Sequence, residues 1–197
     1  MTIQVDLEVA SGGDDTWLGS GSPDQNNSTE LNLGQRLASN FENRPLIKFD
    51  FSALPSGIQI ISAVLHVYVI NYATGPRPVE IRRVLRADAN PAQATWNVYK
   101  TGSNWTIGGC GSDGNDRSAT VMASGSVSAN GWKTFPLDLD EFKQMVINGQ
   151  HLIISRITTV DGPAAYEAYD AAGGAGNHAF IRVNYDLVGG VQAVWFT

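Results

Sequence analysis

The amino-acid sequence predicts an all-β protein, a jelly-roll-like antiparallel β-sandwich with one short helix. The first observation is a pair of apolar runs, residues 46–51 and 60–70, in which side chains alternate between two faces. The second is the connection between them, where Pro55 and Gly57 supply turn-forming residues. The third is composition, since 21 Gly and 8 Pro in 197 residues fit many short strands joined by turns. These observations predict two packed sheets built around the two strands.

The other strands are predicted from the same alternation of apolar and polar residues. A strand over residues 3–9 opens the chain. The stretch 35–43 is mostly polar and is predicted to be a loop. Residues 128–131 are typical of the turn of a hairpin between strands 119–127 and 132–137. Further strands are predicted over residues 30–33, 79–87, 152–157, 166–169 and 179–186.

One helix is predicted after the second of these hairpin strands. Asp138 is suited to the N-cap position, and Glu141, three residues later, completes the pattern of a capping box. Gly149 is suited to end the helix. The apolar stripe of the helix consists of Leu139, Phe142, Met145 and Val146. We expect this helix to cover one end of the sandwich.

The longer central strand is apolar on both faces, so we expect each face to be covered. One face carries Ala63, Leu65, Val67 and Val69, and the other carries Val64, His66, Tyr68 and Ile70. This position favours His66 as a hydrogen-bonded core residue. A metal site is disfavoured, because His66, His151 and His178 lie in different predicted elements without the spacing of metal ligands.

Length and composition limit the number of domains and the classes of partner. A chain of 197 residues fits one all-β domain with one core. The formal net charge of −6, with 13 Lys and Arg spread along the chain, argues against a nucleic-acid partner. No apolar run reaches transmembrane length, so no membrane partner is expected. Cys110 is the only cysteine. Its Gly-Gly-Cys-Gly setting has no nearby His, Lys or Arg to lower the pKa of the thiol, so we expect the thiol to be inert.

The most irregular stretch, residues 95–117, contains two Trp and five Gly. An aromatic ring can stack on the apolar face of a sugar while Asn and Asp fix its hydroxyls. Trp96 and Trp132 adjoin predicted strands and are expected in the core, whereas Trp105 lies in a Gly/Ser loop and is expected to be exposed. The candidate carbohydrate-binding residues are therefore Trp105, Tyr99 and Asn104.

The acidic Gly-rich turn in the same stretch could hold calcium, because Ca²⁺ prefers several oxygen ligands. Asp113, Asn115 and Asp116 are close enough in sequence to converge. They lack the complete EF-hand pattern, and ordinary Asx turns are the favoured interpretation. Calcium is the one cofactor that the sequence suggests; otherwise none is expected.

Enzyme activity is not predicted. The chain lacks the G-x-S-x-G, H-E-x-x-H, Walker A and C-x-x-C motifs. Glycoside hydrolysis would need two carboxylates that meet in space, and Glu80, Glu141 and Glu167 are available. Nothing in the sequence selects any pair of them.

The central segment reads R-P-L-I-K-F-D-F-S-A-L-P-S-G and continues to Tyr68. It resembles the core pattern of the DNRLRE family of β-sandwich domains. Residues 14–34 resemble its opening, A-T-W-N (residues 94–97) its Thr-Trp-Asn element, and F-I-R-V-N-Y (residues 180–185) its closing strand. The resemblance implies a non-catalytic module of the kind found on secreted, surface or polysaccharide-degrading proteins and sometimes on virus particles.

The last residues lie beyond this resemblance. We therefore divide the chain into a DNRLRE-like sandwich, residues 1–186, and a C-terminal apolar strand or docking tail, residues 187–197. The tail could pair with its own sheet or dock on a neighbouring subunit. Its candidate interface residues are Val191, Val194, Trp195 and Phe196.

Two functions follow as hypotheses. The chain opens with a predicted strand and without the pattern of a signal peptide, which favours a structural protein of a bacteriophage particle assembled in the host cytoplasm. Such a protein could be a capsid decoration subunit that binds a capsid or other virion protein and forms a homo-oligomer. The alternative is an extracellular carbohydrate-binding module that recognises an acidic or neutral polysaccharide.

Overall fold

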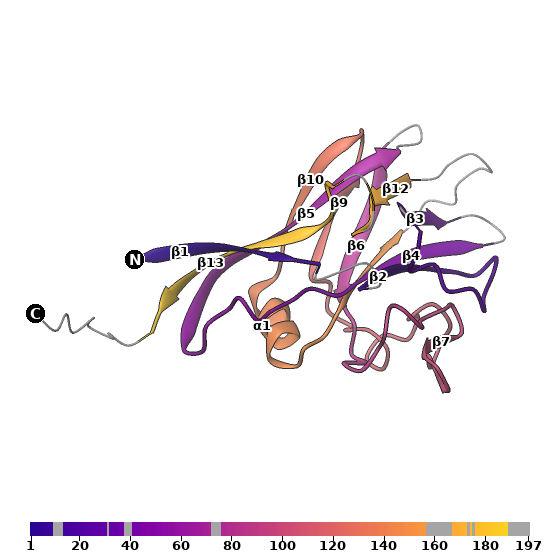
Figure 1. Cartoon of the computed structure of the whole chain (residues 1–197), viewed down its shortest axis with the longest axis horizontal. Coiled ribbons are helices and arrows are strands. Elements are labelled where there is room, and N and C mark those ends of the chain that lie inside the picture. Colours follow the sequence, from indigo (N-terminus) through magenta and orange to yellow (C-terminus); the bar gives the residue numbers. More distant parts are fainter. Residues whose placement is uncertain are drawn as a thin grey trace, which may run out of the picture.

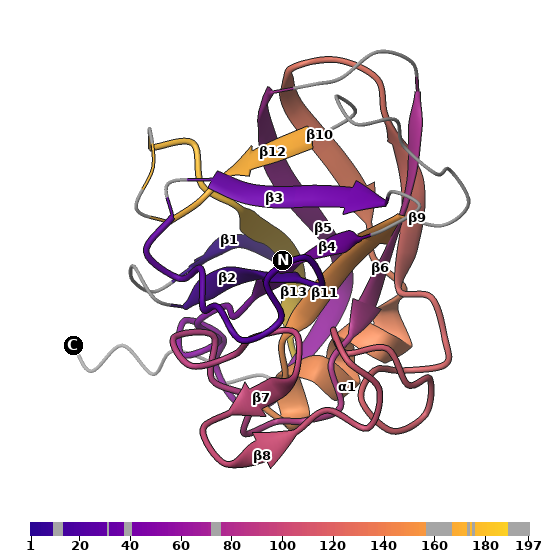
Figure 2. The same cartoon turned by 90° about the vertical axis from the view of Figure 1, so that its right-hand side faces the viewer.

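The computed structural model describes residues 1–9, 14–30, 32–37, 41–71, 76–156, 167–172, 174 and 176–188. It confirms an all-β sandwich of antiparallel strands, with one helix among the described residues (Figures 1 and 2). The strands are β1 (Thr2–Glu8), β2 (Asp15–Gly19), β3 (Asn32–Leu37), β4 (Glu42–Ile47), β5 (Ile58–Asn71), β6 (Arg77–Arg83), β7 (Val98–Lys100), β8 (Ser103–Asn104), β9 (Ala123–Val127), β10 (Gly131–Pro136), β11 (Leu152–Arg156), β12 (Glu167–Asp170) and β13 (Phe180–Leu187), and the helix is α1 (Leu139–Ile147).

The first sheet is centred on β5. One edge of β5 pairs with β13 and, further along, with β12, while the other edge pairs with β10. β1 pairs with the far side of β13 in a register that sets Thr2 opposite Asp186, and the two strands run side by side in Figure 1. The four neighbouring strands β1, β13, β5 and β10 thus form a continuous antiparallel surface.

The second sheet contains β2, β4, β11, β6 and β9. β4 pairs with β2 and β11, and β6 pairs with β11 and β9. β3 joins the two sheets, because it pairs with β12 of the first and with β4 of the second. The short β7–β8 ribbon lies apart from both sheets, at the lower end of Figure 2.

The main core lies between the sheets. Alternation along β5 turns Ala63, Leu65, Val67 and Val69 inward, where all four are buried. Val79 and Ile81 of β6 and Ile154 of β11 belong to the same buried cluster. Burial of this apolar surface is the main source of stability for a domain without disulfides.

Helix α1 begins where the sequence predicts. The side chain of Asp138 accepts hydrogen bonds from the backbone N–H groups of Asp140 (3.1 Å) and Glu141 (3.0 Å). The carboxylate of Glu141 does not complete the capping box and instead accepts from Arg83 of β6 at 2.9 Å. Phe142 and Met145 are buried in the main core, so the helix covers one end of the sandwich.

Three predictions of secondary structure are corrected. The strand predicted over 46–51 lies earlier, as β4, and residues 35–43 contribute to β3 and β4 where a loop was predicted. The residues that follow β4 remain tied by backbone hydrogen bonds, since Lys48 N–H donates to Asp14 O (2.8 Å) and Asp50 N–H to Glu8 O (3.0 Å). A short strand, β2, forms where no strand was predicted.

The predicted hairpin 119–137 is also wrong in its pairing. β9 pairs with β6 of the second sheet and β10 with β5 of the first, so the connection at 128–130 crosses from one sheet to the other. The backbone of β9 is therefore hydrogen-bonded within the second sheet, and that of β10 within the first. Val127 and Phe135 both face the main core from opposite sides.

Candidate functional site

An aromatic cluster lies on the outer face of the first sheet. We define the aromatic platform as His66, Tyr68, Trp132 and Phe180. The register places Trp132 of β10 opposite Tyr68 of β5, and Phe180 of β13 opposite His66 of β5. Because directly paired residues share a face of the sheet, all four rings lie on the side away from the main core. The prediction that His66 is a core residue is therefore wrong, since alternation along β5 turns this ring outward.

Trp132 is at the centre of the platform. Its ring centroid lies 5.3 Å from that of Tyr68, 5.4 Å from that of Phe180 and 6.4 Å from that of His66, with interplanar angles of 77°, 69° and 72°. Phe180 is two strands away, so the indole reaches across β5 to contact it. Trp132 thus contacts three rings, while 44% of the residue remains exposed. The expectation that Trp132 is a core residue is corrected.

Polar groups border the platform along β1 and β13. Arg182 donates from Nε to Asp6 Oδ1 (2.8 Å) and from Nη2 to Asp6 Oδ2 (2.7 Å), a bidentate pair. The guanidinium of Arg182 also lies over the ring of Phe180, 5.3 Å from its centroid. One row further along, Asn184 donates to Ser62 Oγ at 2.8 Å. Hydrogen-bonding groups therefore continue from the edge of the aromatic surface.

The electrostatics of this face follow from its packing. Burial lowers the pKa of His66, the nearby charge of Arg182 lowers it further, and Asp6 partly offsets both. The ring stacks on Phe180 at 4.3 Å and 9°, an arrangement that suits a neutral imidazole. The hydrogen bond from Arg182 lowers the pKa of Asp6, so this carboxylate is charged at neutral pH.

The sequence-predicted carbohydrate residues do not form an open aromatic surface. Trp105 is only 5% exposed, and its indole N–H donates to Thr95 O at 3.0 Å. The expectation that Trp105 is exposed is therefore wrong. The ring belongs to a second buried cluster, on the outer face of the second sheet, with Leu18, Leu46, Val84, Ala89, Ala94, Cys110 and Ile153.

The neighbours of Trp105 are more accessible. Tyr99 is half-buried, its ring tilted against that of Trp105 at 5.5 Å, with Arg86 and Lys100 over it at 5.4 and 5.8 Å. Asn104 is exposed on β8. The Tyr99 ring thus already contacts one aromatic ring and two cations, which leaves less free aromatic surface than Trp132 offers.

Trp96 is held between protein groups rather than offered to a ligand. It packs partly buried against the second cluster, as the core expectation implies, with Arg44 5.3 Å from its ring. A Cβ at Gly109 would lie 2.3 Å from this ring, and one at Gly108 2.4 Å from its Nε1. Glycine is required at both positions because the backbone passes directly over the indole.

The residues considered for calcium are engaged with protein groups. Asp116 is fully buried, and its carboxylate accepts from the backbone N–H groups of Thr106 (2.9 Å), Ile107 (3.0 Å) and Ser112 (3.3 Å). Asp113 pairs with Arg117 at 2.6 Å, and Asn115 donates to Ser112 Oγ at 3.0 Å. Across the described residues, no group of three or more His, Cys, Asp or Glu is placed to hold a metal ion.

The pKa values in this loop agree with those contacts. Burial acts to raise the pKa of Asp116, but the hydrogen bonds from Ile107, Thr106 and Ser112 outweigh it, and the pKa is lowered. Burial raises the pKa of the Cys110 thiol far above its ordinary value. This thiol is also 0% exposed, consistent with the inert thiol that the sequence predicts.

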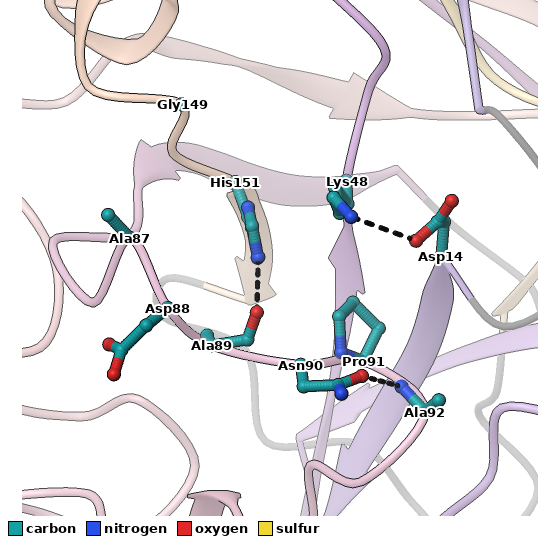
Figure 3. A pocket seen from close by; sticks show the side chains of 10 residues that line it. All are labelled: Asp14, Lys48, Ala87, Asp88, Ala89, Asn90, Pro91, Ala92, Gly149 and His151. Atoms are coloured by element: carbon teal, nitrogen blue, oxygen red, sulfur yellow. Dashed lines mark hydrogen bonds and ion pairs between the residues drawn. The ribbon is translucent and has the colours of Figure 1, made fainter.

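A polar pocket of about 540 Å³ lies elsewhere, between the segment after β4 and residues 87–92 (Figure 3). Lys48 pairs with Asp14 at 3.3 Å, and the buried His151 contacts Ala89 O through Nε2 at 2.6 Å. Asp88, also at this pocket, pairs with Lys100. Its charged groups thus have protein partners, and the pocket lacks an exposed aromatic ring among its lining residues. The aromatic platform is the stronger candidate for a binding site.

The platform could not be found from local patterns alone. The sequence does indicate that the outer face of β5 is apolar, through Val64, His66 and Tyr68. It does not indicate that Trp132 and Phe180 come from the strands on either side of β5, which depends on sheet order and register. The expected cover over this face is absent from the described part of the chain, where Trp132 faces solvent.

The fold and this site define a class of protein, an all-β sandwich with an aromatic surface bordered by hydrogen-bonding groups, as carbohydrate-binding modules have. A comparison with protein families supports this class more specifically. Residues 9–106 match the model of carbohydrate-binding module family 96. The chain is therefore carbohydrate-binding-module-like, and the match is to a family of binding modules. No curated protein matches the chain.

Proposed function

We propose that this protein is a non-catalytic carbohydrate-binding module and that it binds glycans on the aromatic platform. The observation that carries the proposal is the partly exposed Trp132, whose indole contacts three aromatic rings. The family match over residues 9–106 supports the functional class independently. A module of this kind acts by binding and needs no catalytic group.

The physical basis is stacking combined with hydrogen bonding. The axial C–H groups of a pyranose form an apolar face that packs on an indole, and each sugar hydroxyl needs a hydrogen-bonding partner when water is displaced. Because Trp132 is held by its neighbours, little conformational entropy is lost when a sugar covers it. Asp6, Arg182 and Asn184 lie along the same face and are suited to the hydroxyls.

Trp132→Ala tests this proposal. We expect this variant to lose at least about tenfold in affinity for the glycans that the wild-type protein binds on an array and retards in affinity electrophoresis. Its urea midpoint should fall by less than that of a core variant, because 44% of the residue is already exposed in the folded protein. The matched control is Ile147→Ala, which removes an apolar side chain that is 74% exposed at the end of α1 and not on a strand of the platform.

The control should bind like wild type. If Trp132→Ala binds as well as Ile147→Ala, the platform is not the binding site. If the wild-type protein binds no glycan, the proposed function itself is wrong.

The role in a bacteriophage particle remains a prediction, and no observation favours it over carbohydrate binding. Val191, Val194, Trp195 and Phe196, on which the docking hypothesis depends, lie outside the described residues. An extracellular location agrees better with a polysaccharide ligand than a virion does, and we propose it on that ground. No helix in the described part of the chain is long and apolar enough to cross a membrane.

A further inference from the structure

An apolar groove of about 740 Å³ lies between the beginning of β5 and the end of α1. We call it the end groove. Apolar residues of three segments line it: Ile58 and Ile60 of β5, Val146 and Ile147 of α1, and Val188, which follows β13. The residues of the aromatic platform are not among those that line it. The end groove is therefore a second surface, separate from the candidate glycan site.

The end groove is an open end of the main core. Ile60 belongs to the buried cluster between the sheets, and Phe51 and Leu54 pack against that cluster although they are only partly buried. Two further groove residues, Ile147 and Val188, are 74% and 61% exposed. Apolar surface that gathers in this way is typical of a place where another segment or molecule binds.

A β-bulge in β5 turns the strand toward the end groove. Asn184 of β13 lies opposite Ser62, but the next residue, Tyr185, lies opposite Ile60, so Ile61 is an extra residue in β5. Strict alternation would turn Ile60 to the same face as Ser62. The extra residue reverses this, and Ile60 is buried while Ile61 is 43% exposed.

The same part of β5 has an edge that no described strand pairs with. On the side of β10, pairing ends at Val64, and Leu137 N–H donates the last hydrogen bond to Ala63 O at 2.9 Å. Residues 58–62 have β13 on their other side. Three of them, residues 58–60, line the end groove. The backbone groups of an open edge can pair with an added strand, so an extended apolar segment suits this surface.

The last described residue brings the rest of the chain to the end groove. Val188 lines the groove, and its N–H donates to Gly57 O at 3.0 Å. Residues 189–197 follow and read G-G-V-Q-A-V-W-F-T. The two Gly permit a sharp change of chain direction. The remaining residues are mostly apolar and include no Asp, Glu, Lys or Arg.

We propose that residues 191–197 turn back at Gly189 and Gly190 and fill the end groove of their own chain, with Trp195 as the main anchor. Trp195 carries the largest apolar surface in this segment, and a groove of this size has room for an indole. A two-residue connection gives the segment an effective concentration of millimolar order at the groove, which favours the same chain over a second copy.

Of the two roles that the sequence leaves open for the tail, this proposal selects packing on its own domain over docking on a neighbouring subunit. It is independent of the proposed function, because it concerns a different surface.

The test uses the full chain and three substitutions. The difference between the fluorescence of wild type and of Trp195→Phe gives the emission of Trp195 alone. Ile147→Ser removes an apolar side chain from the end groove. Its matched control is Ile107→Ser, the same change at an isoleucine that is 58% exposed and does not line the groove. Each isoleucine variant is measured with and without Trp195→Phe.

We expect Trp195 to emit at a shorter wavelength than free tryptophan, because its indole has left water. Ile147→Ser should move this emission toward that of free tryptophan and lower Tm by about 2–4 °C relative to Ile107→Ser. The reason is that an isoleucine 74% exposed among the described residues contributes this much only if the segment covers it. In a Trp195→Ala background the two isoleucine variants should melt alike.

Light scattering should show a monomer whose Tm does not depend on protein concentration. Emission of Trp195 like that of free tryptophan, or equal Tm values for Ile147→Ser and Ile107→Ser, overturns the proposal. A dimer that loses the Trp195 emission shift on dilution also overturns it, because the groove would then hold the segment of a second copy. Glycan binding enters none of these measurements, so their failure leaves the aromatic platform unaffected.

Discussion

Phe49 lies just after β4, and its side chain enters the main core although its backbone has left the strand. The residue is 3% exposed and belongs to the cluster between the sheets. Phe51, two residues on, is only partly buried and meets Phe142 of α1 edge-on, with ring centroids 6.5 Å apart. Removal of each ring therefore compares the loss of stability for a buried phenylalanine with that for a partly buried one.

We predict that Phe49→Ala lowers the free energy of unfolding by about 3–5 kcal/mol, because the buried ring leaves a cavity that the surrounding sheets cannot close. Phe51→Ala should cost less, since part of its ring already contacts water. Urea unfolding of both variants measures the difference. A midpoint for Phe49→Ala close to that of wild type would contradict its place in the core.

Trp105 and Trp132 show what sequence reasoning could not decide at this scale. Trp105 stands in a Gly- and Ser-containing loop, the usual setting of an exposed residue, and Trp132 opens an alternating run, the usual setting of a buried one. Their exposure is reversed because it depends on distant partners. Trp105 is covered by residues from β2, β4 and β11, whereas Trp132, on the outward side of β10, contacts only neighbouring side chains of its own sheet among the described residues and stays 44% exposed. Local pattern indicates that a side chain is apolar, but not which surface meets it.

Helix α1 was predictable as an element because its signals are local. The cap, the apolar stripe and the closing Gly149 all lie within a dozen residues, and the structure agrees with each of them. The strands around β5 were predictable in existence for the same reason. Their pairing was not, because the order β1–β13–β5–β10 joins segments that are far apart in sequence, and the turn between β9 and β10 carries no mark that it crosses between sheets.

We predict that Asp138→Ala destabilises the protein by about 1 kcal/mol through loss of the N-cap. Asp138 accepts two backbone N–H groups at the start of α1, whereas Asp140, in the first turn, accepts none of the hydrogen bonds that cap the helix. Asp140→Ala therefore serves as a control that removes a similar charge near the same helix dipole. It should cost only a few tenths of a kcal/mol. Equal losses for the two variants in thermal unfolding would show that charge, not capping, is what Asp138 contributes.

Within the described residues, one outer face of the sandwich is covered by another layer of the chain and the other is not. Residues 84–118 pack on the outer face of the second sheet, where Val84, Trp105 and Cys110 meet Leu46 and Ile153 in the second buried cluster. The outer face of the first sheet carries the aromatic platform instead. This asymmetry explains why the aromatic residues of the loop region serve stability while those of β5, β10 and β13 are available for binding.

Asp116 holds together parts of the layer formed by residues 84–118, which covers the outer face of the second sheet. Its carboxylate joins three backbone N–H groups to Arg86, whose Nη2 lies 3.3 Å from Oδ1. These donors supply the positive partners that a cation would otherwise provide. We therefore expect the layer to hold together without calcium.

The last prediction compares melting of the whole protein under two conditions and in two variants. Wild type should melt at the same temperature with millimolar calcium and with chelator, because a metal stabilises only a native state that binds it. Asp116→Asn should lower Tm by about 3–12 °C in both conditions, since hydrogen bonds to a charged group contribute about 1.5–3 kcal/mol and a domain of this size shifts by about 2–4 °C per kcal/mol. The control, Asp113→Asn, weakens ion pairs with Arg117 (2.6 Å) and Arg82 (3.9 Å) that are half exposed on the aspartate side, and should shift Tm little. A Tm that rises with calcium in wild type and does not in either variant would instead establish a calcium site in this loop.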